Sequence, residues 1–311
     1  MSHLEKNSNS DPNKDTLQRF LFESTPIRGE FIRLEKSFQA IHDQHAYPPL
    51  LRRLLGEALC VAGLLSSMIK FKGRVTMQFQ GKGHLKLLLA QCNDQFHLRG
   101  LIKWEGPPDF SNQDLIAAFQ EGTLVIMLES GKNEVRYQGV VAWHGESLAE
   151  SIEGYFQHSE QLATKLWLAV NDTSAAGLLL QVIPSSEREV TSLEKETTQL
   201  HWQRMVQLTS VLQPAQLLHI NNYALLQQLY PQEEIRLFPD VSVVFRCTCT
   251  LKRSENAIVL LGQPEAEDEL KKHQKIVVTC EFCNKEYIFD RVDVARIFAE
   301  QNNVGPPSDI H

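Results

Sequence analysis

In the first 184 residues, segments with helical spacing of the hydrophobic residues alternate with segments that have strand spacing. Helical spacing marks a segment from Leu50 to Phe71, which opens after a proline pair and has apolar residues at 51, 54, 55, 58, 59, 62 and 65. Strand spacing marks Val75, Met77 and Phe79, which alternate with polar residues. The same reasoning predicts strands at 28–34, 84–92, 96–104, 123–129, 134–142, 161–170 and 175–183, and further helices at 35–45 and 147–157.

Tight turns separate several of these strands. Gly and Asn residues mark turns at 81–83, 93–94 and 131–133. Consecutive strands joined by tight turns pair antiparallel, so we predict the α+β class, with an N-terminal mixed α/β domain over residues 16–184 and helices packed on largely antiparallel sheets. Residues 1–15 are almost wholly polar and are predicted to be a disordered extension without the apolar stretch of a signal peptide.

The pattern changes after Pro184. Residues 185–240 contain neither glycine nor cysteine and are rich in glutamine. Apolar residues return at roughly helical spacing between Leu193 and Leu212, and Pro214 begins a second helical stretch. This composition differs from that of a flexible linker, so we predict a helical linker whose apolar stripe must pack on a partner. An ordinary helical subdomain is the alternative.

A third piece spans residues 241–295. Val241, Val243 and Phe245 alternate into Cys247 and Cys249, which predicts one strand through both cysteines. A short helix follows an acidic stretch at 265–269, residues 276–283 and 286–289 form a hairpin, and a last helix at 292–301 leads into a C-terminal tail counted from residue 296.

Composition narrows the class of protein. The 311 residues are 42% hydrophobic and 22% charged, which is enough to build a core. The net charge of −7 argues against a protein that grips nucleic-acid phosphates, and no apolar run is long enough to span a bilayer. Six cysteines are too few for a disulfide scaffold in a chain of this length. We therefore expect a cytoplasmic protein without nucleic-acid or membrane partners.

Four of the six cysteines form two close pairs. Cys247 and Cys249 flank one residue, and Cys280 and Cys283 flank two. Side chains at positions i and i+2 of a strand face one side, and a C-x-x-C turn directs both sulfurs to one point. Two such pairs suit one structural Zn²⁺ per chain in tetrahedral thiolate coordination. Reducible disulfides without metal, chance buried thiols and an iron–sulfur cluster remain alternatives.

The other candidate groups have simpler interpretations. Cys60 lies on an apolar helix face and Cys92 ends a strand, so both are predicted to be small buried hydrophobes. His273, between the cysteine pairs, is expected to be a solvated surface histidine. The histidines, serines and carboxylates show no catalytic spacing, and we expect no enzyme. Gly81-Lys82-Gly83 lacks the spacing of a phosphate-binding loop.

Two functions would also use paired cysteines. A nucleic-acid-binding zinc ribbon should be basic, but residues 241–311 hold nine Lys and Arg against eleven Asp and Glu. A thiol-disulfide oxidoreductase uses one C-x-x-C that opens a helix, whereas this pair lies in a predicted hairpin beside a second pair. The oxidoreductase and a constitutive zinc-ribbon adaptor remain the alternative functions.

The order of these features resembles the redox-regulated chaperones of the heat-shock protein 33 family, also called 33 kDa chaperonins. The resemblance covers about Asp15 to Ala299 and is most specific at Phe245-Arg-Cys-Thr-Cys249 and Cys280-Glu-Phe-Cys283. Supporting segments are Arg19-Phe-Leu-Phe-Glu23, Arg28-Gly-Glu30, Gln78-Phe-Gln-Gly81, Arg136-Tyr-Gln-Gly-Val140, Tyr155-Phe156, Ser159-Glu-Gln161 and Leu179-Leu-Gln-Val-Ile-Pro184. Ala163 and Ala176 depart from the proline and glycine usual there, which puts loop geometry in doubt but leaves the cysteines intact.

The resemblance implies a holdase that protects unfolding or oxidatively damaged proteins from aggregation without ATP. In such proteins the reduced, zinc-bound form is inactive. Oxidation forms the disulfides Cys247–Cys249 and Cys280–Cys283, releases zinc and unfolds the linker, and the oxidised protein dimerises and binds unfolding client proteins. Residues 185–240 would then be a metastable linker and 241–295 a zinc-binding redox-switch domain.

Elementary energetics agree with such a switch. Structural zinc contributes about 10–16 kcal/mol in small domains. A piece of about fifty residues has little core, so loss of zinc should unfold it. We expect the linker, deprived of that packing partner, to expose its apolar stripe, as a promiscuous holdase requires.

Overall fold

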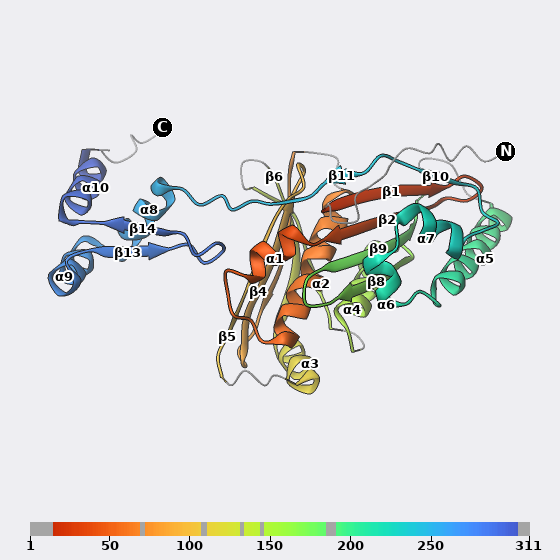
Figure 1. The fold of residues 1–311 in the computed structure, drawn as a ribbon, viewed down its shortest axis with the longest axis horizontal. Helices are drawn as coiled ribbons and strands as arrows, with labels where there is room; N and C mark the ends of the chain where they lie inside the picture. Colours follow the sequence, from red (N-terminus) through yellow and green to blue (C-terminus); the bar gives the residue numbers. More distant parts are fainter. Residues whose placement is uncertain are drawn as a thin grey trace. The chain divides into compact units, whose positions relative to one another are not determined.

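The computed structural model describes residues 15–68, 72–106, 111–130, 134–143, 146–184 and 191–303. It divides into two compact units, Met1–Arg246 and Cys247–His311 (Figure 1). Most of the predicted N-terminal extension, the predicted turn at 131–133, the first residues of the linker and the end of the C-terminal tail lie outside the described residues.

One six-stranded sheet, here sheet A, lies between a central helix and the linker. Its order is β10-β1-β2-β9-β8, with β11 paired to β1, and every pairing is antiparallel. The strands are β1 (Thr16–Phe22), β2 (Ile27–Leu34), β8 (Thr164–Val170), β9 (Ala175–Val182), β10 (Ile235–Leu237) and β11 (Val241–Ser242). Strand β9 is nearly all apolar because both of its faces are buried.

The second sheet of the first unit, sheet B, also has six strands. Its order is β12-β5-β4-β3-β6-β7, antiparallel except where β12 runs parallel to β5. The strands are β3 (Gly73–Gln80), β4 (Leu85–Asn93), β5 (His97–Trp104), β6 (Thr123–Ser130), β7 (Val135–Val141) and β12 (Val244–Phe245). The predicted turns at 81–83 and 93–94 join β3 to β4 and β4 to β5.

Helix α2 (Pro49–Ser66) is the centre of the main core and contacts strands of both sheets. Almost every side chain from Leu54 to Ser66 is buried, because the helix lies between two apolar sheet faces. Gly63 permits close approach to sheet A, since a Cβ there would lie 2.2 Å from Ile32 Cδ1. Shorter elements complete this core: α1 (Lys36–His42), α3 (Asn112–Glu121), α4 (Leu148–Tyr155) and a π-helix, η1 (Phe156–Glu160).

The linker forms three helices that pack on the face of sheet A opposite α2. They are α5 (Ser192–Thr209), α6 (Pro214–His219) and α7 (Asn222–Leu229), with Pro214 in the first turn of α6 as expected. Their buried side chains join a second core with Phe20, Phe22 and Phe31 of sheet A. Sheet A is therefore a packing partner of the linker that the sequence reasoning did not identify.

The strand predicted from Val241 through Cys249 does not form as one element. The chain pairs with β1 of sheet A at β11 and then with β5 of sheet B at β12. Val243, 2% exposed, lies between these two short strands and donates its backbone N–H to Asp15 O. The two cysteines follow in irregular backbone, because the chain leaves the sheets after Phe245.

The second unit is small. Helices α8 (Leu251–Leu261), α9 (Gln263–His273) and α10 (Arg291–Asn303) pack with the hairpin β13 (Ile276–Thr279) and β14 (Glu286–Phe289). Its buried core among the described residues consists of Ile258, Ala266, Leu270, Ile276, Tyr287, Phe289, Val294 and Ile297. Helix α10 continues to Asn303, so the tail predicted from residue 296 begins inside a helix.

The predicted α+β class is confirmed, with antiparallel sheets and the predicted central helix. Among the described residues, four elements had no counterpart in the sequence prediction: β1, β10, α3 and α8. Strand β1 follows the polar N-terminal stretch directly and is defined by pairing with segments up to 226 residues away, such as Ser242 opposite Thr16. Helix α3 begins with a capping box in which Ser111 and Asp114 satisfy each other's backbone N–H groups.

Candidate metal centre

A tight turn in the β13–β14 hairpin positions one pair of cysteines. The backbone N–H of Cys283 and that of Asn284 both donate to Cys280 O, at 3.3 and 2.8 Å, and Cys280 N–H donates to Lys285 O at 2.9 Å. Asn284 adopts a positive φ of 50°, which asparagine tolerates better than most residues. The turn brings both sulfurs to the same side, as the C-x-x-C spacing predicts.

The other pair lies immediately before α8. Thr250 is the N-cap of this helix, and its side chain accepts from Arg253 N–H. Arg253 Nη1 donates back to Thr248 O and Thr248 Oγ1, at 2.8 and 2.7 Å. These contacts, rather than the pleat of a strand, hold the segment with Cys247 and Cys249 in place.

The four sulfurs converge on one point. Every Sγ of Cys247, Cys249, Cys280 and Cys283 lies within 4.8 Å of the others. The shortest separations are 3.5 Å between Cys247 and Cys280 and 3.6 Å between Cys249 and Cys283. A tetrahedral zinc with Zn–S bonds of about 2.3 Å would place its sulfurs about 3.8 Å apart. The cluster could therefore hold a metal ion such as zinc, with all four cysteines as ligands.

The protein environment shifts the pKa values of three of these thiols in different directions. Burial raises the pKa of Cys247 and that of Cys283. Burial acts in the same direction on Cys249, but hydrogen bonds from Tyr287 and the neighbouring thiols outweigh it and lower its pKa to about 7. Four adjacent thiolates would repel one another, so a divalent cation has to supply the compensating charge.

Tyr287 is a residue of the site that the sequence reasoning missed. Its hydroxyl lies 3.3 Å from Cys249 Sγ, and Lys285 Nζ lies 5.0 Å from the centre of its ring. The signal was available in β14, where Tyr287 and Phe289 alternate toward the core and a buried phenol needs a hydrogen-bond partner. Tyr287 thus orients one sulfur from outside the ligand set.

The remaining candidates lie where the sequence predicted. Cys60 on α2 and Cys92 on β4 are fully buried, and burial raises the pKa of each thiol, that of Cys92 to about 12. Both behave as small hydrophobes. His273 is exposed at the end of α9, with Nε2 3.6 Å from a carboxylate oxygen of Glu269. All six cysteines are free thiols.

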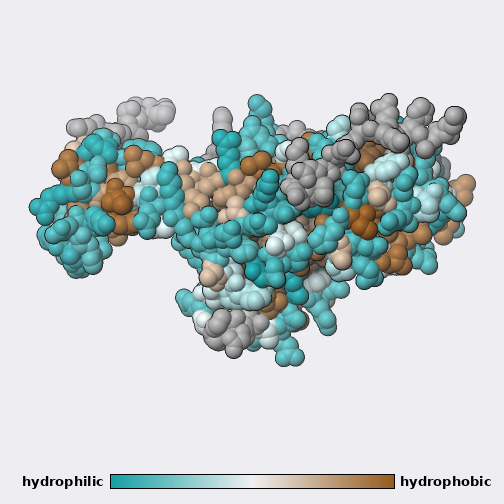
Figure 2. Space-filling model, in the orientation of Figure 1, coloured by the Kyte–Doolittle hydropathy of each residue, from teal (hydrophilic) through white to brown (hydrophobic). Residues whose placement is uncertain are grey.

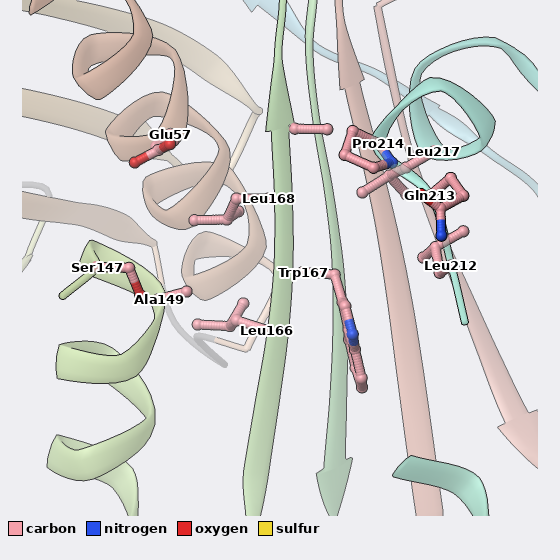
Figure 3. Close-up of a pocket in the computed structure, with 11 residues that line it drawn as sticks. Glu57, Ser147, Ala149, Leu166, Trp167, Leu168, Leu212, Gln213, Pro214 and Leu217 are labelled. Atoms are coloured by element: carbon pink, nitrogen blue, oxygen red, sulfur yellow. The ribbon is translucent and has the colours of Figure 1, made fainter. Parts of the chain in front are cut away.

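A cavity of about 290 Å³ lies along β8, the outer strand of sheet A (Figure 3). Figure 3 shows Leu166 and Leu168 pointing to the side of α2 and α4, and Trp167 pointing to the side of Leu212 and Pro214 of the linker. Among the described lining residues, Glu57 is the charged side chain, and no nucleophile is paired with a base. The cavity has the composition of a packing gap, not of a catalytic site.

Comparison with known proteins places these features in one family. The family described as Hsp33 protein matches residues 15–290. The chain belongs to the Hsp33 family. It is similar to the 33 kDa chaperonin of Shewanella putrefaciens, with 40% identity over 95% of this chain and 99% of that protein. The 33 kDa chaperonin of Pseudomonas aeruginosa is 37% identical over 96% of this chain and 99% of its own length.

The fold of this Hsp33-family chain also matches a solved structure. The crystal structure of the 33 kDa chaperonin from Thermotoga maritima has a TM-score of 0.75 over 93% of this chain and 99% of the other. The two sequences are 20% identical, so the match supports the fold alone. In the described part of the chain, no helix is long and apolar enough to cross a membrane.

Proposed function

We propose that this protein is a molecular chaperone, an ATP-independent holdase that oxidation activates by removing zinc from the four-cysteine cluster. The observation that carries the proposal is the convergence of four free thiols within 4.8 Å of one another in a unit with a small core. A thiolate site is closed and stable while reduced, and it is lost when its ligands become disulfides.

In the proposed redox step, each cysteine pair loses two electrons. Each disulfide, Cys247–Cys249 or Cys280–Cys283, forms when two thiolates give up two electrons to an oxidant such as peroxide, which is reduced to water. Both pairs together remove all four zinc ligands, so the ion leaves. The second unit then loses a contribution of about 10–16 kcal/mol, and the eight-residue core described above is too small to replace it.

Chain connectivity carries this change to the linker. The segment between α7 and Cys247 is held by three very short strands, β10, β11 and β12, paired to β1 and β5. Two- and three-residue strands contribute little stability of their own. Unfolding beyond Cys247 can therefore propagate back through residues 235–246 and release residues 185–240, which act as the metastable linker.

Release of the linker would expose two apolar surfaces at once. Sheet A would lose the cover over Phe20, Phe22 and Phe31, and the linker would lose its own buried leucines. Part of the linker is exposed already, since Leu193 is 73% and Leu200 61% exposed, and Figure 2 shows brown atoms over the linker end of the first unit. Such surfaces bind unfolding proteins without sequence specificity.

The proposal also includes dimerisation of the oxidised form, independence from ATP and a cytoplasmic location. Newly exposed apolar area favours a homodimer in the oxidised form as well as client binding. No nucleotide is required, because the switch draws on the oxidant and on client unfolding. A reducing, cytoplasmic compartment keeps the four thiols ready for zinc until oxidative stress.

Light scattering of a thermally aggregating client tests the proposal with reduced and oxidised protein side by side. Suppression by the oxidised form alone, without ATP, is expected, together with one zinc per reduced chain by elemental analysis. Equal protection of the client by the reduced and the oxidised protein would show that oxidation does not activate the chaperone. Iron instead of zinc, or fast disulfide-reductase turnover, would favour a different cluster or the oxidoreductase alternative.

A further inference from the structure

The face of sheet A beneath the linker is largely apolar, but two neighbouring polar side chains on it bind the linker. Gln18 on β1 and Arg33 on β2 lie on the same face as Phe20 and Phe31, as the register shows, since Thr16 pairs with Arg33 and Gln18 with Phe31. Both polar side chains make hydrogen bonds to the linker beside the apolar residues of this interface.

Arg33 binds the end of helix α6. Its Nη2 donates to Leu217 O at 2.9 Å and to Ile220 O at 2.7 Å. The last carbonyls of a helix have no partner within the helix, so the guanidinium satisfies groups that would otherwise need water. Burial lowers the pKa of Arg33, opposed by the nearby Glu35 carboxylate, which reflects the cost of holding a cation in this interface.

Gln18 binds the start of helix α7 and the chain that follows it. Its Oε1 accepts from Asn222 Nδ2 at 2.9 Å, and its Nε2 donates to Phe238 O at 2.9 Å. Gln18 is 3% exposed and Asn222 is 8% exposed. The amide therefore joins the first residue of α7 to the segment that leads to Cys247.

Apolar packing between the linker and the sheet is incomplete. The 290 Å³ cavity beside β8 is lined by Trp167 on the sheet side and by Leu212 and Leu217 on the linker side. Helix α5 contributes few buried residues, Met205 and Thr209. Because α5 buries few side chains on the sheet, the directional hydrogen bonds matter more at this interface.

We infer that Gln18 and Arg33 form a polar latch, which fastens the junction of α6 and α7 to sheet A and sets how readily the linker is released. The inference rests on the proposed function, because release of the linker is taken as the activating event. Neither residue touches the cysteines, so the latch sets the threshold of the switch independently of zinc binding.

A matched pair of substitutions tests the latch in the full-length, reduced, zinc-loaded protein. Gln18→Leu removes both hydrogen bonds to the linker. Gln181→Leu is the control: Gln181 is 1% exposed in the same sheet, on the opposite face, and also makes two hydrogen bonds, accepting from Arg28 and donating to Thr164. Both changes replace a buried glutamine by leucine in sheet A.

Amide hydrogen exchange over residues 214–229 is the direct measurement. Gln18→Leu leaves Asn222 and the Phe238 carbonyl unpaired against an apolar face, so we expect exchange there to accelerate about tenfold or more. The control variant is expected to keep the wild-type exchange rate in this region. Zinc content should stay at one per chain in both variants.

Asn222→Leu removes the hydrogen bond between Asn222 and Gln18 from the linker side and leaves the sequence of sheet A unchanged. This variant tests the latch if Gln18→Leu does not fold. The double variant Gln18→Leu/Asn222→Leu should accelerate exchange by less than the product of the single effects, since both changes remove one shared bond. Arg33→Met should act in the same direction as Gln18→Leu.

The outcomes separate the latch from the proposed function. Wild-type exchange over 214–229 in Gln18→Leu and Asn222→Leu overturns the latch, even if the oxidised wild-type protein still suppresses aggregation. Accelerated exchange together with client protection by the reduced variants supports both. Accelerated exchange without client protection, in reduced and oxidised forms alike, supports the latch and rejects the proposed holdase.

Discussion

The two compact units differ in the size of the buried core that stabilises each of them. The first unit places helix α2 between two six-stranded sheets and buries a continuous core that includes Phe38, Leu59 and Phe79. The second unit has a two-stranded sheet, three helices and a far smaller core. A large domain is stabilised by burial of apolar surface, whereas a small one needs a further contribution, which a metal ion on the four cysteines could supply here.

Under the proposed function, this difference lets one chain combine a stable scaffold with a responsive switch. Chemistry at the four sulfurs would then unfold the second unit, because its small core leaves much of its stability to the metal site. The same oxidant has little to act on in the first unit, where Cys60 and Cys92 are fully buried and carry raised pKa values. The linker lies between these extremes, docked on the stable unit through an incomplete interface.

Zinc removal should produce the largest effect. Chelation of the reduced protein removes a contribution of about 10–16 kcal/mol from the second unit and none from the first. We expect amide protection to disappear over residues 251–303 and to persist in α2 and β9. Hydrogen exchange with mass spectrometry measures both regions in one sample.

The control for chelation is Cys92→Ser, which should keep its zinc, whereas Cys280→Ser should lose it. Persistent amide protection of residues 251–303 in metal-free protein would contradict this difference between the two units, because the small core would then be enough to keep the second unit folded.

A core cavity in the second unit should weaken zinc binding. Leu270, 4% exposed on α9, does not belong to the ligand set, and Leu270→Ala should destabilise its unit by about 2–5 kcal/mol. Folding and metal binding are linked in this unit, so the loss should appear as lower zinc affinity in competition with a chromogenic chelator.

Leu59→Ala makes the matching cavity in the first unit and should leave zinc affinity unchanged while lowering the free energy of unfolding of that unit. Equal zinc affinity in both variants would show that the metal site forms without the core around it.

The two disulfides should close in order, Cys280–Cys283 first and at a rate about tenfold or more above the second. Cys280 and Cys283 lie in one tight turn with their sulfurs within 4.8 Å of each other, so they need little movement. Cys247 and Cys249 flank Thr248, which Arg253 holds at its carbonyl and hydroxyl, so this segment must unfold before its sulfurs can bond. Timed alkylation with mass spectrometry during peroxide treatment follows both bonds.

Arg253→Met releases Thr248 and should narrow the interval between the two steps. Closure of Cys247–Cys249 first, while circular dichroism still shows a folded linker, would reverse the proposed order.

The smallest expected effect is acid destabilisation of the first unit at one ion pair. Arg74 donates Nε and Nη2 to Glu129, at 2.8 and 2.7 Å, and Thr76 adds a hydroxyl. The hydrogen bonds from Arg74 lower the pKa of Glu129 below its ordinary value of 4.5. A lowered carboxyl pKa stabilises the fold above the unfolded pKa, and this stability is lost as pH falls through the folded value.

Glu129→Gln should therefore reduce unfolding free energy near pH 7 by about 1 kcal/mol or less, since solvent screens part of the pair, and the difference should be smaller at pH 3. Urea unfolding at both pH values measures it. A difference that grows at low pH would mean that the sign of the pKa shift is wrong.

Local patterns determined much of this protein. The period of apolar residues located α2, and turn residues located the β3–β4 and β4–β5 hairpins, because both signals depend on neighbours in sequence. The C-x-C and C-x-x-C spacings identified the four residues that converge in the structure. Cysteine spacing predicted this cluster although the two pairs are far apart in sequence. Two short cysteine motifs in one chain have few common roles other than binding one metal ion.

Only the tertiary structure decided how distant segments meet. It split Val241–Phe245 between two sheets, packed the linker on sheet A, and placed Tyr287 beside Cys249 and Gln18 beside Asn222. A hydrophobic stripe shows that a helix needs a partner but carries no information about which one. That choice depends on the summed packing and hydrogen bonding of residues far apart in sequence, such as Gln18 and Phe238, which are 220 positions apart.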